Sequence, residues 1–348
     1  MLFRSRLFMS PTSDPSFGVA PYSSLSVIGG GAWGTALAVV GAAGTATLLW
    51  AREPDVVDGV NAAHENKRFL SGVALPPGLR ATADLAVAAK AEAVLLVPPA
   101  QFLRATASQL RGLIAPGTPV VLCAKGIEDK TGALLTEVLK ETLPEASPAM
   151  LSGPSFARDV ARGLPTAVTV AAACGIAERP QSTLGRARGF RPYITDDLVG
   201  VALGGAAKNV YAIACGMVMG AGYGESARAA MLARGFAELL RLGSALGARA
   251  ETLMGLSGLG DLALTATTMT SRNFALGTAL GKGDSVAIAT AEGKPLAEGA
   301  ATAPALIKRA RAHNVELPIA QAVADVLAGR FTVAQAAENL LNRPLGKE

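Results

Sequence analysis

The sequence is poor in the residues on which metal-dependent and nucleophilic hydrolases depend. Its 348 residues include only two histidines, His64 and His313, which lie far apart in polar stretches. A zinc site or a Ser-His-Asp triad therefore has little to draw on, and we expect no metal. The three cysteines, Cys123, Cys174 and Cys215, show no Cys-x-x-Cys spacing. Their odd number and apolar neighbours favour buried thiols in a reducing compartment, so we expect a cytoplasmic protein.

Aromatic and charged residues are also scarce. Aromatics make up 5% of the chain and charged residues 17%, and the net charge of +5 is scattered along it. Nucleic-acid binding would need a basic face or a stacking platform, so we expect small anionic ligands instead. Residues 201–221 come closest to the length and apolarity of a membrane span, but Lys208 and Asn209 interrupt them, so we expect no membrane insertion.

The length and composition favour two domains with a sizeable core. Half of the residues are hydrophobic, which suits an α/β sheet and tightly packed helices. Residues 1–23 carry early arginines and then a Ser/Pro-rich run, without an apolar stretch of signal-peptide length. We expect a disordered extension over 1–23, a dinucleotide-binding domain over 24–196 and a helical substrate domain over 197–343.

A glycine motif follows the first predicted strand. Residues 25–28 are a short β-type run, and residues 35–40 are typical of a helix. Between them Gly29, Gly31 and Gly34 form Gly-x-Gly-x-x-Gly in the strand–turn–helix context that the motif needs. The first glycine permits a tight turn, the second a close approach to a pyrophosphate, and the third close helix–strand packing. This predicts a dinucleotide at the positive end of the helix.

The end of the second predicted strand bears on the choice of cofactor. Residues 46–50 are a second apolar run, and Arg52 and Glu53 follow it. An arginine at this place can accept the 2′-phosphate of NADP, while an acidic residue suits the ribose hydroxyls of NAD. We therefore expect NADP(H) or NAD(H). The competing interpretation of Arg52 is a solvated surface charge.

Later β-type runs favour a doubly wound parallel sheet. Such a sheet binds its ligands beyond the carboxyl ends of its strands. Helical stretches separate the runs, and the last three of them can continue the sheet. The runs are residues 93–97, 119–123, 151, 167–170 and 192–194.

Two polar segments directly follow predicted strands and should share the edge of the sheet with the glycine motif. One contains Lys125 and the other is the turn of residues 152–155. In this turn Gly153 lets a ligand approach, Pro154 stiffens the chain, and Ser155 offers a hydroxyl. The alternative is an ordinary strand-to-helix turn.

The second half reads as helical, and Lys208 lies in its most apolar stretch. Asp196 or Asp197 can cap a long helix in which Lys208 and Asn209 are surrounded by small and apolar residues. Burial lowers the pKa of a lysine, which then exchanges a proton near neutral pH. Alcohol-to-ketone hydride transfer needs such a group, so Lys208 is the candidate. A lysine that extends from an apolar helix to water is the alternative.

Three further motifs supply polar groups to the second half. Asp261 ends a glycine-rich turn, and residues 271–273, Ser-Arg-Asn, read as a helix start. The planar guanidinium of Arg272 matches a phosphate, although a surface helix cap with a solvated arginine is possible. Glu298 follows a Gly/Lys-rich loop and either reaches the cofactor or caps the next helix.

Taken together, these motifs resemble those of bacterial NAD(P)-dependent glycerol-3-phosphate dehydrogenases, from about Leu25 to the C-terminal helices. The resemblance implies a Rossmann-like doubly wound α/β sheet followed by an all-α C-terminal domain of the 6-phosphogluconate-dehydrogenase-like kind. It also implies reversible conversion of sn-glycerol 3-phosphate to dihydroxyacetone phosphate, a reaction whose reductive direction usually feeds phospholipid synthesis. The stretches that carry it are 29–38, 124–127, 151–157, 204–210, 258–262 and 271–273.

The same resemblance implies roles for individual residues. Lys208 matches the catalytic proton acceptor. The positions that match substrate-binding residues are Lys125, Gly153, Ser155, Asp261, Ser271, Arg272 and Asn273. The positions that match cofactor-binding residues are Trp33, Arg52, Lys125, Ala157, Arg272, Leu296 and Glu298, beside the glycines of the loop.

Two other functions stay open at the level of the sequence. One is a related two-domain dehydrogenase that acts on a hydroxy acid or a ketopantoate-like acid. The other is a non-catalytic NADP-binding regulator. An alanine-rich helical domain often buries a partner face, which makes a homodimer the expected assembly.

Overall fold

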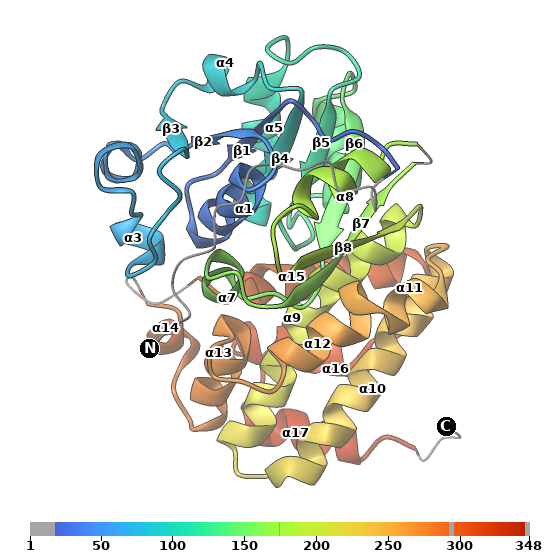
Figure 1. The fold of residues 1–348 in the computed structure, drawn as a ribbon. Helices are drawn as coiled ribbons and strands as arrows, with labels where there is room; N and C mark the ends of the chain where they lie inside the picture. The colour runs from blue at the N-terminus through green and yellow to red at the C-terminus, as the bar shows by residue number, and fades with distance from the viewer. Residues whose placement is uncertain (1–17, 174, 292–295, 345–348) are drawn as a thin grey trace.

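The computed structural model describes residues 18–173, 175–291 and 296–344. The expectations for residues 1–17 and for Cys174 lie outside these ranges. Tyr22 is buried, with its ring under the guanidinium of Arg179, so packing begins ahead of the first strand. Figure 1 shows a sheet flanked by helices in one part of the molecule and a helical bundle in the other. We call these parts the sheet half, which ends with β8, and the helical half, which begins with α9.

The sheet half contains an eight-stranded sheet in the order β3-β2-β1-β4-β5-β6-β7-β8. All neighbours from β3 to β6 pair in parallel. The residues of β4 are all buried, as expected for a strand covered on both faces. The strands are β1 (Ser24–Ile28), β2 (Ala46–Trp50), β3 (Arg80–Thr82), β4 (Ala93–Leu96), β5 (Pro119–Leu122), β6 (Ser147–Ser152), β7 (Thr166–Ala172) and β8 (Phe190–Thr195).

The doubly wound sheet is confirmed, but it is not parallel throughout. β7 pairs with β6 in the antiparallel sense, and β8 then pairs with β7 in parallel. A parallel pair needs a crossover that returns the chain to the opposite edge of the sheet. The segment between β6 and β7 holds only the short helix α7 (Ala157–Ala161). The chain therefore re-enters the sheet from the edge at which it left.

Short helices connect the strands of the sheet half. The longest is α1 (Ala32–Ala42), which starts directly after the glycine loop. The others, beside α7, are α2 (Pro54–Asp58), η1 (Gly59–Ala63), α3 (Lys67–Leu70), α4 (Leu85–Ala88), η2 (Ala100–Phe102), α5 (Leu103–Leu110), α6 (Leu135–Thr142) and α8 (Glu178–Leu184).

Helix α9 (Leu198–Gly220) is the centre of the helical half. The backbone N–H of Gly200 donates to Asp197 Oδ1 at 2.7 Å, which caps the helix. Among the described residues, α9 alone is long and apolar enough to cross a membrane, and 89% of its most apolar stretch is buried inside the protein. The other described elements of the helical half are α10 (Gly224–Ala245), α11 (Ala250–Met254), η3 (Leu256–Gly260), α12 (Asp261–Thr265), α13 (Arg272–Gly281), α14 (Val286–Ala289), α15 (Glu298–Ala312), α16 (Pro318–Leu327) and α17 (Val333–Leu341).

Glycines let α9 and α13 touch through their backbones. A Cβ added at any of four glycines would lie 2.0 to 2.3 Å from a carbonyl oxygen of the other helix, where no methyl group fits. These glycines are Gly216 and Gly220 of α9, and Gly277 and Gly281 of α13. Helix α13 is thereby held against the C-terminal third of α9.

The two halves share a hydrophobic core. One cluster of buried side chains runs from β4 and β5 through α9 to α15 and α16. The last strand ends at Thr195 and α9 begins at Leu198. We keep the domain division at 196/197 as a proposal.

Candidate active site

Lys125 connects the carboxyl end of the sheet with the helical half. It follows β5, and its Nζ donates to the carbonyl oxygen of Gly153 at 3.0 Å and to Asp261 Oδ2 at 2.6 Å. Gly153 follows β6, whereas Asp261 begins α12. Residues from three separate predicted motifs thus meet at one point, at the edge of the sheet where ligands of doubly wound folds bind.

Lys208 approaches the same carboxylate from α9. Its Nζ donates to Asp261 Oδ1 at 2.5 Å and to Thr265 Oγ1 at 2.8 Å. Burial, opposed by Asp261 and assisted by the positive charge of Lys125, lowers the pKa of Lys208 from 10.5 to about 8. This lysine is buried, which decides against the alternative of a side chain that extends to water. It can exchange a proton near neutral pH.

Asp261 is shared between the two lysines and is fully buried. A buried carboxylate is stable only where cations or hydrogen-bond donors surround it, and here two ammonium groups do so. Thr265, which the sequence analysis missed, lies one helical turn further along α12. Its hydroxyl donates to the Asp261 carbonyl at 2.6 Å and accepts from Lys208. Thr265 could have been found from its position four residues after Asp261, because residues with this spacing lie on the same face of a helix.

The Ser-Gly-Pro-Ser turn owes its glycine to the neighbouring strand. Gly153 has φ +146°, and a Cβ there would lie 2.8 Å from Val168 Cα of β7. The close contact that the structure shows at Gly153 is therefore with the backbone of β7. The Ser155 hydroxyl donates to the Gly153 carbonyl at 3.1 Å. This carbonyl also accepts from Lys125, so the turn orients the lysine.

The helix start predicted at residues 271–273 is confirmed. Ser271 Oγ accepts from the backbone N–H of Phe274 at 3.2 Å and caps α13. Arg272 is exposed, while Asn273 is buried and donates to Asn209 Oδ1 of α9 at 2.9 Å. The N-terminal end of α13, with the exposed guanidinium of Arg272 beside it, suits an anion.

Glu298 begins α15 but does not cap it with its side chain. Its carboxylate accepts instead from the backbone N–H of Ala100 at 3.4 Å, beside the end of β4. Burial raises the pKa of Glu298, and the charge of Arg272 acts in the opposite direction. Leu296 is 55% exposed. Glu298 therefore lies between the anion end of the site and the sheet.

The glycine loop fits a dinucleotide. A Cβ at Gly34 would lie 1.8 Å from the carbonyl oxygen of Gly29, whereas a Cβ at Gly31 would meet nothing within 4 Å. Gly34 thus serves packing, and Gly31 leaves room in front of the N-terminus of α1. The indole N–H of Trp33 is buried and has no hydrogen-bond partner among the described residues. Ala157 begins α7, which packs against α1.

Arg52 lies away from the lysine cluster. Its side chain is 81% exposed and pairs with Glu53 at 3.2 Å. It follows β2 at the ligand-binding edge of the sheet, where the adenosine end of a dinucleotide is held in such folds. The structure brings together Lys125, Gly153, Lys208 and Asp261, and it leaves Arg52 and Leu296 exposed.

Comparison with known proteins identifies the family. Residues 24–176 match the model of the NAD-dependent glycerol-3-phosphate dehydrogenase N-terminus, and residues 197–338 match that of its C-terminus. A glycerol-3-phosphate dehydrogenase [NAD(P)+] of Rhodospirillum rubrum is 56% identical over 93% of each chain. That of Parvibaculum lavamentivorans is 54% identical over 94% of this chain and 98% of its own.

A solved structure agrees with these sequence matches. The crystal structure of glycerol-3-phosphate dehydrogenase from Coxiella burnetii superposes with a TM-score of 0.86 at 36% identity, and covers 93% of this chain and 100% of its own. Both halves of the fold and nearly the whole length are therefore accounted for. The chain belongs to the NAD-dependent glycerol-3-phosphate dehydrogenase family.

Proposed function

We propose that the protein catalyses reversible hydride transfer between NAD(P)H and dihydroxyacetone phosphate, with sn-glycerol 3-phosphate as the reduced product. The observation that carries the proposal is the buried Asp261 carboxylate shared by Lys125 and Lys208 at the edge of a dinucleotide-binding sheet. The relatives named glycerol-3-phosphate dehydrogenase [NAD(P)+] support both the reaction and the cofactor.

Lys208 is the proposed proton donor to the C2 oxygen in the reductive direction, and the acceptor in the reverse direction. Its lowered pKa leaves both protonation states accessible near neutral pH. Asp261 and Thr265 hold the ammonium group in place. When bound, the nicotinamide supplies or takes up the hydride. Lys125 adds a second positive charge beside the same carboxylate, where negative charge develops on the substrate oxygen.

The start of α13 is the proposed site for the substrate phosphate. Arg272 supplies the guanidinium, and Ser271 and Asn273 flank it. A phosphate bound there, away from the reacting carbon, would orient the substrate, so that binding energy accelerates the chemical step. Lys125, Gly153, Ser155 and Asp261 complete the proposed substrate site. The proposed cofactor residues are Gly29, Gly31, Trp33, Gly34, Arg52, Lys125, Ala157, Arg272, Leu296 and Glu298.

The cofactor phosphate has a candidate partner in Arg52. Its exposed guanidinium, held only by the neighbouring Glu53 among the contacts described, is free to turn toward a 2′-phosphate. Glu53 offers a carboxylate for ribose hydroxyls. Use of both NADP(H) and NAD(H) is therefore proposed. Supply of glycerol 3-phosphate for phospholipid synthesis, a cytoplasmic location and a homodimer complete the proposal.

The test is oxidation of NADPH by the purified protein with dihydroxyacetone phosphate, followed by the absorbance of the reduced cofactor. The control reactions use NADH, and dihydroxyacetone without its phosphate. Rapid oxidation that requires the phosphate supports the reaction and the anion site together. Absence of oxidation, from a protein that still binds NADPH, rejects the proposal in favour of a hydroxy-acid dehydrogenase or a regulator.

A further inference from the structure

Lys125 lies at the start of a segment with little regular structure. Residues 124–134, which we call the Lys125 loop, connect β5 to α6. Inside the loop, Ile127 forms an isolated bridge with Leu134, and the Glu128 N–H donates to the Ala133 carbonyl at 3.0 Å. The Gly132 N–H donates back to the Glu128 carbonyl at 2.8 Å. These bonds close the loop on itself but do not attach it to the rest of the protein.

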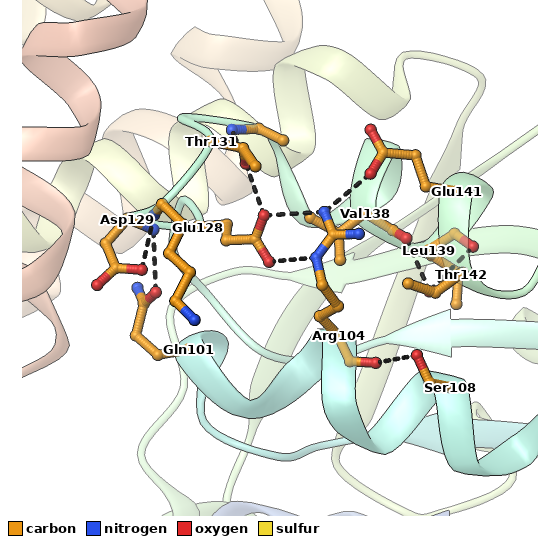
Figure 2. Close-up of polar contacts among 12 residues, drawn as sticks. Gln101, Arg104, Ser108, Glu128, Asp129, Thr131, Val138, Leu139, Glu141 and Thr142 are labelled. Carbon is orange, nitrogen blue, oxygen red and sulfur yellow. Dashed lines mark hydrogen bonds and ion pairs between the residues drawn. The ribbon is translucent and has the colours of Figure 1, made fainter.

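The side chain of Glu128 provides an attachment. This carboxylate is three residues beyond Lys125, and the residue is only 6% exposed. Arg104 of α5 binds it with two parallel bonds, Nε to Oε1 at 2.7 Å and Nη2 to Oε2 at 2.9 Å (Figure 2). Thr131 adds a third bond at 2.6 Å. A bidentate guanidinium–carboxylate pair fixes orientation as well as distance.

Gln101, on the short helix η2 just before α5, forms hydrogen bonds with the loop backbone on either side of Glu128. Its Nε2 donates to the Ile127 carbonyl at 2.9 Å. Its Oε1 accepts from the Asp129 N–H at 3.0 Å (Figure 2). Three consecutive loop residues are thus held by one stretch of chain. The held residues begin two positions after Lys125, whose Nζ must reach Asp261 in the other half of the molecule.

We propose that Arg104 and Glu128 are positioning residues that hold the Lys125 loop, so that Lys125 reaches Asp261 and the substrate. This inference rests on the proposed function for its kinetic readout. The Arg104–Glu128 pair lies outside the substrate site and acts on it through Lys125. A pair that served only to stabilise the fold would change stability without a specific effect through Lys125.

The primary variant is Glu128→Ala, and Glu141→Ala is the matched control. Glu141 also accepts from Arg104 Nη2, at 2.8 Å, but it belongs to α6 and its side chain is 57% exposed (Figure 2). Both variants remove one carboxylate from the same arginine. We expect kcat/KM for dihydroxyacetone phosphate to fall at least about tenfold in Glu128→Ala, because small misplacements of active-site groups cost about this much or more. Glu141→Ala should stay within about twofold of the wild type.

A double-mutant cycle separates positioning from stability. If Glu128 acts through Lys125, then Glu128→Ala should cause little further loss of kcat/KM in a Lys125→Ala background. Additive losses would overturn the proposal. Melting temperatures of all four proteins record the purely structural contribution. Glu128→Gln, which keeps the shape of the side chain, replaces Glu128→Ala if that variant does not fold.

A readout without turnover distinguishes this inference from the proposed function. Acetic anhydride labelling of Lys125, quantified by peptide mass spectrometry relative to the exposed Lys90 outside the loop, reports how firmly its ammonium group is held. Labelling should rise in Glu128→Ala and stay unchanged in Glu141→Ala; equal labelling in all three proteins would reject the inference. If the wild type does not reduce dihydroxyacetone phosphate, the proposed function fails and labelling alone decides, as it does when the Lys125→Ala enzyme is too slow to measure.

Discussion

At the scale of single residues, Asp261 holds two lysines of different exposure. The Lys125 side chain is 12% exposed and Lys208 is 8% exposed, and both donate to the same carboxylate. One negative charge cannot fully compensate two buried cations, and burial disfavours the charged form of a lysine. The pKa of Lys208 accordingly falls to about 8, because burial outweighs its contact with Asp261.

Replacement of Lys208 by Ala should lower kcat by a factor of about 100 to 10,000, the usual contribution of a positioned acid–base group. NADPH binding, measured by fluorescence titration, should persist because the glycine loop is unaffected. In the wild type, kcat for reduction should fall as the pH rises through about 8, since reduction needs the protonated lysine, and kcat for oxidation should rise. Near-full turnover by the variant would exclude Lys208 as the proton carrier. Lys90→Ala, at an exposed lysine away from the site, is the surface control.

At the scale of elements, two glycines of the glycine loop have different roles, one in packing and the other in ligand binding. Gly34 lies against the carbonyl of Gly29, and Gly31 faces open space at the start of α1. The first contact is part of the folded protein, whereas the second becomes a contact only when a ligand is present. Substitutions at the two positions should therefore separate folding from binding.

Gly34→Ala should destabilise the fold by about 1–3 kcal/mol or more, because the added methyl overlaps a backbone oxygen. Gly31→Ala should leave the melting temperature nearly unchanged but weaken NADPH binding at least about tenfold, since its methyl would occupy the place of the pyrophosphate. Thermal unfolding without ligand and titration with NADPH measure the two effects. Equal affinity of Gly31→Ala and wild type would contradict the assignment of this loop to the cofactor.

The elements also show which features a sequence reveals. The glycine motif and the caps at Asp197 and Ser271 depend on neighbouring residues, and the structure confirms them as loop and helix starts. The reversal of β7 depends on where the chain turns in space, which no periodicity records. Lys208 and Asp261 are 53 residues apart, so the sequence marks each as a candidate but leaves open whether Asp261 orients Lys208 or the substrate hydroxyls. Arg104 and Glu128 lie in ordinary-looking polar stretches, and only their pairing marks them.

At the scale of the whole molecule, one buried carboxylate ties three helices together. Glu238 of α10 is 2% exposed and accepts from the backbone N–H groups of Ile319 and Ala320 at the start of α16, at 2.7 and 3.2 Å. Tyr211 of α9 and Arg241 of α10 are the other titratable groups that act on it. Burial raises the pKa of Glu238 from 4.5 to about 7, although the two N–H bonds and Arg241 oppose this. Its ionisation therefore depends on whether the chain is folded.

The free energy of unfolding should consequently decrease as the pH rises from about 4.5 to about 7. In this interval the unfolded chain loses the proton of Glu238 while the folded protein retains it, so the contribution present at low pH is lost. The change amounts to at most about 3 kcal/mol. Urea unfolding of Glu238→Gln, which carries no titratable proton, should lack this component of the slope. An identical pH dependence in variant and wild type would argue against it.

The glycine contact between α9 and α13 sets the spacing between two parts of the proposed site. Lys208 lies on one of these helices and Arg272 starts the other. At the four glycines the two helices touch carbonyl to Cα, in addition to the side-chain bond between Asn273 and Asn209. Side chains can change rotamer and let packed helices slide by fractions of an ångström, but a backbone contact between glycines tolerates neither sliding nor rotation. A shift of α13 by one residue would place a Cβ where only a glycine fits. The span between the proton carrier and the proposed phosphate site is thus fixed by the main chain, and it should stay constant even where the surrounding core is repacked.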